Sequence, residues 1–98
     1  MSKEPMIVKR LLNEEQMDGK IGLFGEVTIF PNEALAFHEH HGETETYYIL
    51  SGTGEYDDNG VKCPAKPGDT FFCKDGDGHG IRCTSAEPLV FMALIIKK

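Results

Sequence analysis

The chain has 98 residues, of which 40% are hydrophobic and 27% are charged, and this balance is typical of one folded globular domain rather than a disordered tail. Sixteen acidic against ten basic residues give a net charge of −6, which excludes a basic surface for nucleic-acid phosphates. There is neither the run of ~20 apolar residues of a membrane-spanning helix nor the apolar run of a signal peptide, so we expect a cytoplasmic protein that binds neither nucleic acid nor membranes.

Short extended segments separated by turn residues follow one another along most of the chain. The helical signal is confined to Glu14–Met17, which is long enough for a single turn. The predicted strands are rich in β-branched and aromatic residues. They fall at residues 22–30, 34–40, 45–51, 55–56, 61–63, 70–73, 80–84 and 89–96. Asn59-Gly60 is typical of a tight hairpin turn. The pattern predicts an all-β sandwich or barrel of roughly eight to ten strands.

The three cysteines, Cys63, Cys73 and Cys83, are odd in number, which argues against a closed set of disulfides. Their even spacing matches no zinc-site pattern. We expect them to be small buried hydrophobic side chains in a reducing compartment.

One segment, His38 to Glu45, concentrates side chains that can bind a metal ion. On a strand, His38 and His40 point to the same face, whereas His41 has the opposite parity and is expected at the surface or behind the ligands. Glu45 follows a glycine-containing turn, so a hairpin can bring its carboxylate beside the imidazoles. His79, far along the chain, also begins a strand. Three histidines and one glutamate suit Fe, Mn, Ni, Zn or Co, although a His-rich solvated loop is the alternative.

These residues resemble the two sequence motifs of the cupin family. The first motif is His-x-His, three or four residues, Glu, six residues and Gly, and it corresponds here to His38, His40, Glu45 and Gly52. The second motif contains a Pro-Gly-Asp turn and a histidine about ten residues later, and it corresponds here to Pro67-Gly68-Asp69 and His79.

Two positions depart from the family pattern. Cys83 stands where the family often has asparagine, and residues 74–78 lack the usual proline before the last histidine. The resemblance implies a small single-domain cupin over residues 1–98, built as a β-barrel of the jelly-roll or double-stranded β-helix type. Its core spans about 22–96, and residues 1–21 form an N-terminal arm or strand.

Strand alternation indicates which other side chains share the face of the ligands. It places Tyr47 and Ile49 with Glu45, and Ile81 and Cys83 with His79, so these four are predicted to line the pocket. Tyr47 either hydrogen-bonds a ligand or is a core aromatic residue. Tyr48 and Leu50 face the other way and form an apolar stripe, which a second sheet or a partner subunit must cover.

The resemblance also implies one divalent transition metal ion, Fe, Mn, Ni, Zn or Co, held by His38, His40, Glu45 and His79. We expect first a metal-dependent enzyme acting on a small oxygen-bearing metabolite, such as a sugar or carboxylate, of isomerase, lyase or dioxygenase type. The alternatives are a non-catalytic small-molecule binding or sensing module, and a metal that only stabilises the fold. We expect a homodimer.

Overall fold

The computed structural model describes residues 6–98. Within this range it contains one short helix and nine strands, in a chain order close to the predicted one. The elements are β1 (Met6–Arg10), α1 (Glu14–Met17), β2 (Ile21–Ile29), β3 (Ala34–Glu39), β4 (Glu43–Ser51), β5 (Gly54–Asp58), β6 (Val61–Ala65), β7 (Thr70–Cys73), β8 (Gly78–Cys83) and β9 (Leu89–Lys97). The N-terminal arm or strand predicted at 1–21 therefore contains β1 and α1, and its residues 1–5 lie outside the described range.

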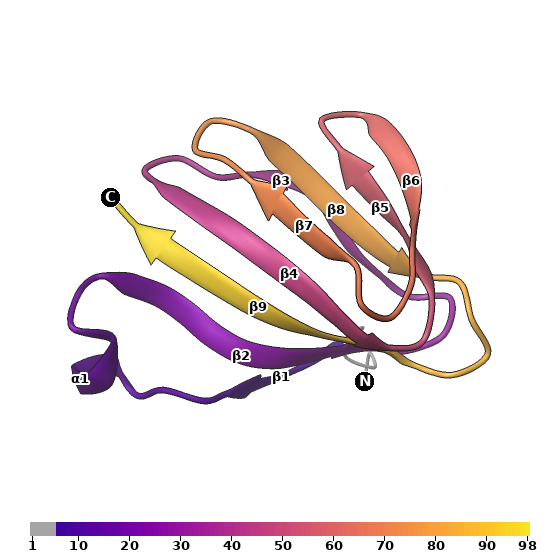
Figure 1. The fold of residues 1–98 in the computed structure, drawn as a ribbon, viewed down its shortest axis with the longest axis horizontal. Helices are drawn as coiled ribbons and strands as arrows, with labels where there is room; N and C mark the ends of the chain where they lie inside the picture. The colour runs from indigo at the N-terminus through magenta and orange to yellow at the C-terminus, as the bar shows by residue number, and fades with distance from the viewer. Residues whose placement is uncertain (1–5) are drawn as a thin grey trace, which may run out of the picture.

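The strands form two antiparallel sheets that lie as two layers (Figure 1). One sheet has five strands in the order β1-β2-β9-β4-β7, and the other has four in the order β3-β8-β5-β6. Successive strands mostly change sheets, so neighbours such as β4 and β9 come from distant parts of the chain. The predicted all-β, jelly-roll type of fold is confirmed.

The core lies between the two sheets and follows the alternation of the strands. On β4, Tyr47 and Ile49 are buried, whereas their neighbours Tyr48 and Leu50 are exposed on the outer face of the five-stranded sheet. Alternate residues of β9 are buried in the same way, as Phe91 illustrates. This packing fixes which side chains point to the interior, and the candidate ligands are among them.

Local turn chemistry explains two of the connections. Asn59 and Gly60 both have positive φ values, 52° and 92°, and they join β5 to β6 as the predicted hairpin. The helix α1 begins with a capping box, in which Asn13 and Gln16 exchange side-chain-to-backbone hydrogen bonds. It ends after one turn because Asp18 adopts the left-handed conformation.

The cysteines are free thiols, of which Cys73 and Cys83 are buried and Cys63 is half-buried. The prediction that the cysteines are buried is therefore confirmed for Cys73 and Cys83 and only partly for Cys63. Of the helices within residues 6–98, none has the length and apolar character that crossing a membrane requires.

Candidate metal centre

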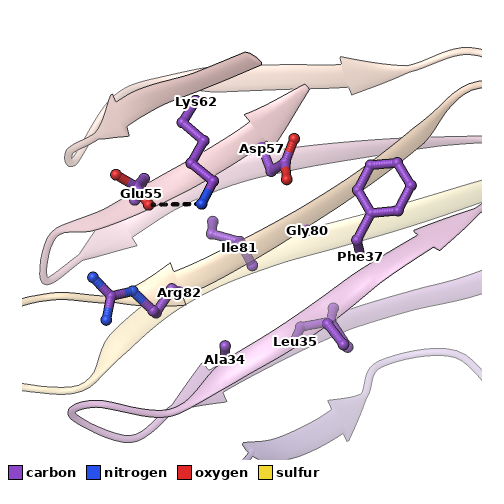
Figure 2. A pocket seen from close by; sticks show the side chains of 10 residues that line it. Ala34, Leu35, Phe37, Glu55, Asp57, Lys62, Gly80, Ile81 and Arg82 are labelled. Carbon is purple, nitrogen blue, oxygen red and sulfur yellow. Dashed lines mark ion pairs between the residues drawn. The ribbon is translucent and has the colours of Figure 1, made fainter. Parts of the chain in front are cut away.

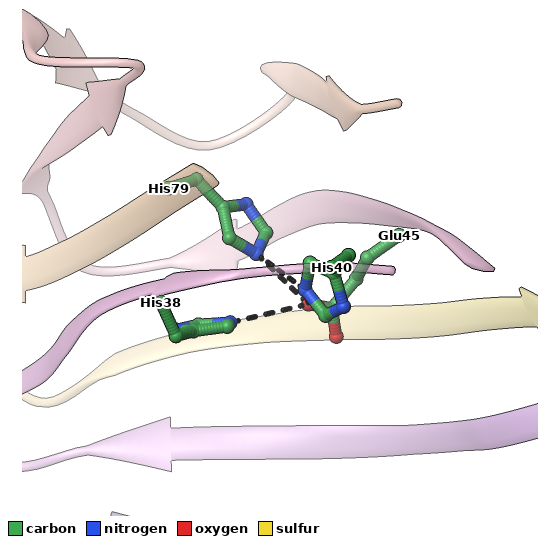
Figure 3. Close-up of side chains that lie close together, drawn as sticks. All are labelled: His38, His40, Glu45 and His79. Atoms are coloured by element: carbon green, nitrogen blue, oxygen red, sulfur yellow. Dashed lines mark hydrogen bonds and ion pairs between the residues drawn. The ribbon is translucent and has the colours of Figure 1, made fainter. Parts of the chain in front are cut away.

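Two neighbouring strands of the four-stranded sheet contribute the first two candidate ligands. His38 on β3 lies directly opposite His79 on β8, so both imidazoles point from the sheet toward the interior (Figure 3). The register of β3 shifts between Leu35 and His38. Such an irregularity changes the direction of the following side chains, and here it aligns the two histidines.

The third histidine lies just beyond the end of β3 and is held by a loop. The backbone N–H of His40 donates to the carbonyl of Asp77 at 3.0 Å, and its carbonyl accepts from the N–H of Gly76 at 2.7 Å. Both partners belong to the β7–β8 connection, which leads into His79. The same loop therefore positions two of the candidate ligands.

Glu45 comes from β4 in the opposite sheet, so the cluster spans the two layers. Its Oε1 lies 2.9 Å from Nε2 of His40, 2.9 Å from Nε2 of His79 and 3.8 Å from Nε2 of His38. The Nε2 atoms of His40 and His79 are 3.0 Å apart. One ligand atom from each of the four residues lies within 4.8 Å of the others, as the sequence predicted for this set (Figure 3).

The cluster has one accessible side. The side chains of His40, Glu45 and His79 are buried, whereas that of His38 is 34% exposed. A small molecule that reaches the cluster would therefore approach beside His38.

Each imidazole presents Nε2 to the centre because another group binds its Nδ1. His38 Nδ1 contacts the carbonyl of Ala36 at 2.8 Å, and His40 Nδ1 contacts Oε2 of Glu43 at 2.6 Å. A carbonyl or a carboxylate can only accept a hydrogen bond, so both Nδ1 atoms carry the proton. His79 Nδ1 contacts the hydroxyl of Tyr56 at 2.9 Å. Such outer partners orient the histidines of metal sites.

The geometry and chemistry of this donor set fit a divalent metal ion. A metal–nitrogen bond of about 2.1 Å places two ligands at right angles about 3.0 Å apart, which is close to the shortest distances in the cluster. With the proton on Nδ1, Nε2 of a neutral His38 or His40 ring would carry a lone pair facing the Glu45 carboxylate, which is also an acceptor. A cation among them satisfies all four groups at once, and imidazole with carboxylate suits a transition metal.

Two buried tyrosines border the cluster on its inner side. The ring of Tyr47 stacks on that of His79 at 4.8 Å, and its hydroxyl lies 3.4 Å from His79 Nε2. Burial raises the pKa of Tyr47 well above its ordinary value, and the nearby Glu45 charge raises it further. Burial likewise raises the pKa of Tyr56. Both phenols therefore remain protonated and act as hydrogen-bonding groups.

The other predicted pocket residues have different surroundings. Of the four, Tyr47 touches the cluster, whereas Ile49, Ile81 and Cys83 are buried within the hydrophobic core that supports it. His41 is exposed, as its parity predicted, and its Nε2 lies 3.2 Å from Oε1 of Glu39.

Sequence reasoning missed two residues that contact the cluster, Glu43 and Tyr56. Glu43 could have been found, because it has the same strand parity as Glu45 and lies three residues after His40. Tyr56 has no local signal. It reaches His79 because β5 pairs with β8, and no short-range pattern specifies that pairing.

A shallow hollow of about 150 Å³ lies away from the cluster, on the outer face of the four-stranded sheet (Figure 2). Its floor includes Gly80, and its walls include Phe37, Lys62 and Arg82. Gly80 lies where β8 pairs with β3, and an added Cβ would lie 3.0 Å from the backbone nitrogen of Phe37, so the two strands pack tightly at this point.

Comparison with known proteins identifies the family. A family model described as a cupin domain matches residues 25–95, which is most of the chain. The chain therefore belongs to the cupin family, as its motifs indicated. It is similar to an oxalate-binding protein from Thermotoga maritima, with 42% identity over 86 residues that cover 88% of this chain and 71% of the relative.

Solved structures agree with this assignment. The fold matches that of a predicted oxalate decarboxylase from Thermotoga maritima with a TM-score of 0.92 and 39% identity, over 95% of this chain and 81% of the other. It also matches the cupin domain of Cnp3 from Schizosaccharomyces pombe with a TM-score of 0.86, over 98% of this chain and 67% of the other. Identity to the Cnp3 domain is 16%, so that likeness shows the fold alone.

Proposed function

We propose that this protein binds one divalent transition metal ion through His38, His40, Glu45 and His79, and that the loaded site holds oxalate or a similarly small carboxylate. The observation that carries the proposal is the convergence of four possible ligand atoms, three imidazole nitrogens and one carboxylate oxygen, within 4.8 Å. A bound ion would supply a positive charge and open coordination positions that attract carboxylate oxygens. The relative with 42% identity is named an oxalate-binding protein, which supports this ligand class.

Groups of the chain itself define how such a ligand would sit. The exposed edge of His38 marks the side of entry, and the buried core behind Ile49 and Ile81 closes the opposite side. The Tyr47 hydroxyl stays protonated, interacts with Glu45 and lies 3.4 Å from His79 Nε2, so it would border the inner side of the site.

We favour a protein that binds the carboxylate without converting it over the metal-dependent enzyme expected from the sequence. The carboxylates that touch the cluster are both engaged, Glu45 among the imidazoles and Glu43 with His40. Turnover of the same ligand is the second candidate, because the structure with 39% identity is described as a predicted oxalate decarboxylase. Both candidates share the metal site and differ in whether the carboxylate is released unchanged.

A calorimetric titration of oxalate into metal-loaded and metal-stripped protein tests the proposal. We expect binding to the loaded protein alone, with weaker binding of acetate because it has one carboxylate. An excess of oxalate at 100 times Kd should stabilise the loaded protein by about 2.7 kcal/mol. Absence of oxalate binding by the loaded protein would contradict the proposal. Formate and carbon dioxide in the same samples would identify turnover, and unchanged oxalate would identify a binding protein.

We also propose that two copies of the chain form a homodimer through the outer face of the five-stranded sheet. The outer face of the five-stranded sheet carries exposed aromatic side chains, including Tyr48, which is 46% exposed, and Phe72, which is 59% exposed. Apolar patches of this kind often mark protein–protein contacts. This face carries little charge, so two copies of an acidic chain can meet there without strong repulsion. The cytoplasmic location remains a prediction.

A further inference from the structure

Glu43 differs from the other groups that hold the histidines because it is charged. The partners of His38 and His79 at Nδ1 are the carbonyl of Ala36 and the hydroxyl of Tyr56, which are both neutral. The partner of His40 is a carboxylate, and the contact of 2.6 Å is short for a nitrogen–oxygen pair. Hydrogen bonds of this length with a charged acceptor are among the stronger ones in proteins.

The environment of this pair strengthens it further. The side chain of His40 is 7% exposed and that of Glu43 is 29% exposed, so water screens their interaction less than at an open surface. Glu43 opens β4 and shares its inward parity with Glu45, so the same strand supplies a candidate ligand and the partner of another. The pair is therefore built into the sheet and does not depend on a mobile surface side chain.

His40 differs from the other two histidines in how its backbone is held. His38 and His79 lie on strands and are paired in register, whereas His40 follows the last residue of β3. Loop hydrogen bonds fix the His40 backbone, but they leave its ring free to rotate and to change tautomer. The Glu43 contact removes both freedoms, because it keeps the proton on Nδ1 and leaves the Nε2 lone pair directed to the centre.

We propose that Glu43 is a positioning residue that sets the metal affinity of the site through His40. This inference rests on the proposed metal site and deepens it. The carboxylate selects the tautomer of His40 that can bind a metal. It makes Nε2 a stronger electron-pair donor to the ion, and it adds a second negative charge near the site, in addition to that of Glu45. Loss of such an outer partner typically weakens metal binding by about 10–100-fold.

The chain offers a matched control in the pair formed by Glu39 and His41. This pair also joins a carboxylate to an imidazole, at 3.2 Å, and it lies in the same stretch of sequence. Both of its side chains are mostly exposed, and neither contacts the cluster. Glu39→Ala therefore removes the same charge as Glu43→Ala without touching a candidate ligand.

The test measures the affinity of Zn²⁺ and Co²⁺ by competition with a chromophoric chelator in wild type, Glu43→Ala, Glu43→Gln and Glu39→Ala. We expect Glu43→Ala to bind about 10–100-fold more weakly and Glu39→Ala to bind like wild type. Glu43→Gln should recover part of the loss, because its amide oxygen still accepts from Nδ1–H. The visible spectrum of bound Co²⁺ should change in Glu43→Ala and remain that of wild type in Glu39→Ala.

Several results would overturn the inference. Equal affinities of Glu43→Ala and wild type would show that the carboxylate does not act through His40, and equal weakening by Glu39→Ala would show a general charge effect. If Glu43→Ala does not fold in the metal-free state, Glu43→Gln carries the comparison, and wild-type affinity and spectrum in that variant would contradict the role of the charge. A wild-type protein that binds neither ion would remove the proposed function together with this inference.

Discussion

The hydrogen bond between Tyr56 and His79 is one of the few polar contacts inside the core, and Tyr56→Phe removes it with little change in volume. The hydroxyl lies 2.9 Å from His79 Nδ1, and both residues are almost inaccessible to solvent. The ring of Tyr56 stacks on Phe71 at 4.1 Å, and phenylalanine keeps that contact. The substitution therefore leaves a buried nitrogen of His79 without its partner, and this typically costs about 1–3 kcal/mol.

Urea denaturation of the metal-free protein measures this cost directly. We expect the free energy of unfolding to fall by about 1–3 kcal/mol, and Tm to fall by about 4–8 °C for each kcal/mol lost. Tyr48→Phe is the matched control, because that hydroxyl lies on an exposed side chain of the outer face and its removal should cost less than about 0.5 kcal/mol. Equal effects of the two substitutions would show that the Tyr56 hydroxyl does not stabilise the core through His79.

Three further predictions address the packing, the thiols and the outer face. Gly54→Ala should destabilise the fold by about 1–3 kcal/mol or more in urea denaturation, because the added Cβ would lie too close to the carbonyl oxygen of Arg82. A variant as stable as wild type would contradict this close approach. Burial, aided by the nearby Asp77 charge, raises the pKa of the Cys73 thiol to about 11, so native protein should react slowly with iodoacetamide at mildly alkaline pH. An acid whose pKa is raised by folding destabilises the folded state as pH rises above its ordinary value, so stability should decrease above about pH 8.5, and the buried phenols of Tyr47 and Tyr56 should extend the decrease above about pH 10. A Cys73→Ala variant should lose less stability than wild type between about pH 8.5 and pH 10, and an equal loss would contradict the assignment. Phe72→Glu should convert a dimer to a monomer in light scattering, whereas a wild-type monomer would refute the proposed dimer.

Strand alternation and turn chemistry account for the parts of the fold that could be predicted from sequence. Residues 45–50 alternate between buried and more exposed positions, and β4 has almost the predicted bounds. The Asn59-Gly60 turn closes the predicted hairpin because both residues tolerate positive φ. Local patterns do not encode which strands pair, however, because partners such as β4 and β9 are distant in sequence and meet only in the folded chain.

The candidate site also contains residues that could be predicted from the sequence and residues that depend on contacts between distant segments. The four candidate ligands could be predicted because a known motif specifies them and strand parity agrees with it. The alternation argument described His40 incompletely, since this residue lies beyond β3 and depends on loop contacts with Gly76 and Asp77. Tyr56 could not be predicted at all, because its role follows from the pairing of β5 with β8.

Metal content per chain shows whether His38, His40, Glu45 and His79 hold an ion. The protein would be expressed without a histidine tag, alongside His79→Ala and the control His41→Ala, and analysed by mass spectrometry for Fe, Mn, Co, Ni and Zn before and after reloading. We predict about one metal ion per chain in wild type and in His41→Ala, because His41 is exposed and pairs with Glu39 outside the cluster. We predict loss of the ion in His79→Ala, whose imidazole is buried at the centre. A wild-type chain that holds no metal after reloading, or a His79→Ala chain that retains it, would contradict a metal site at these residues.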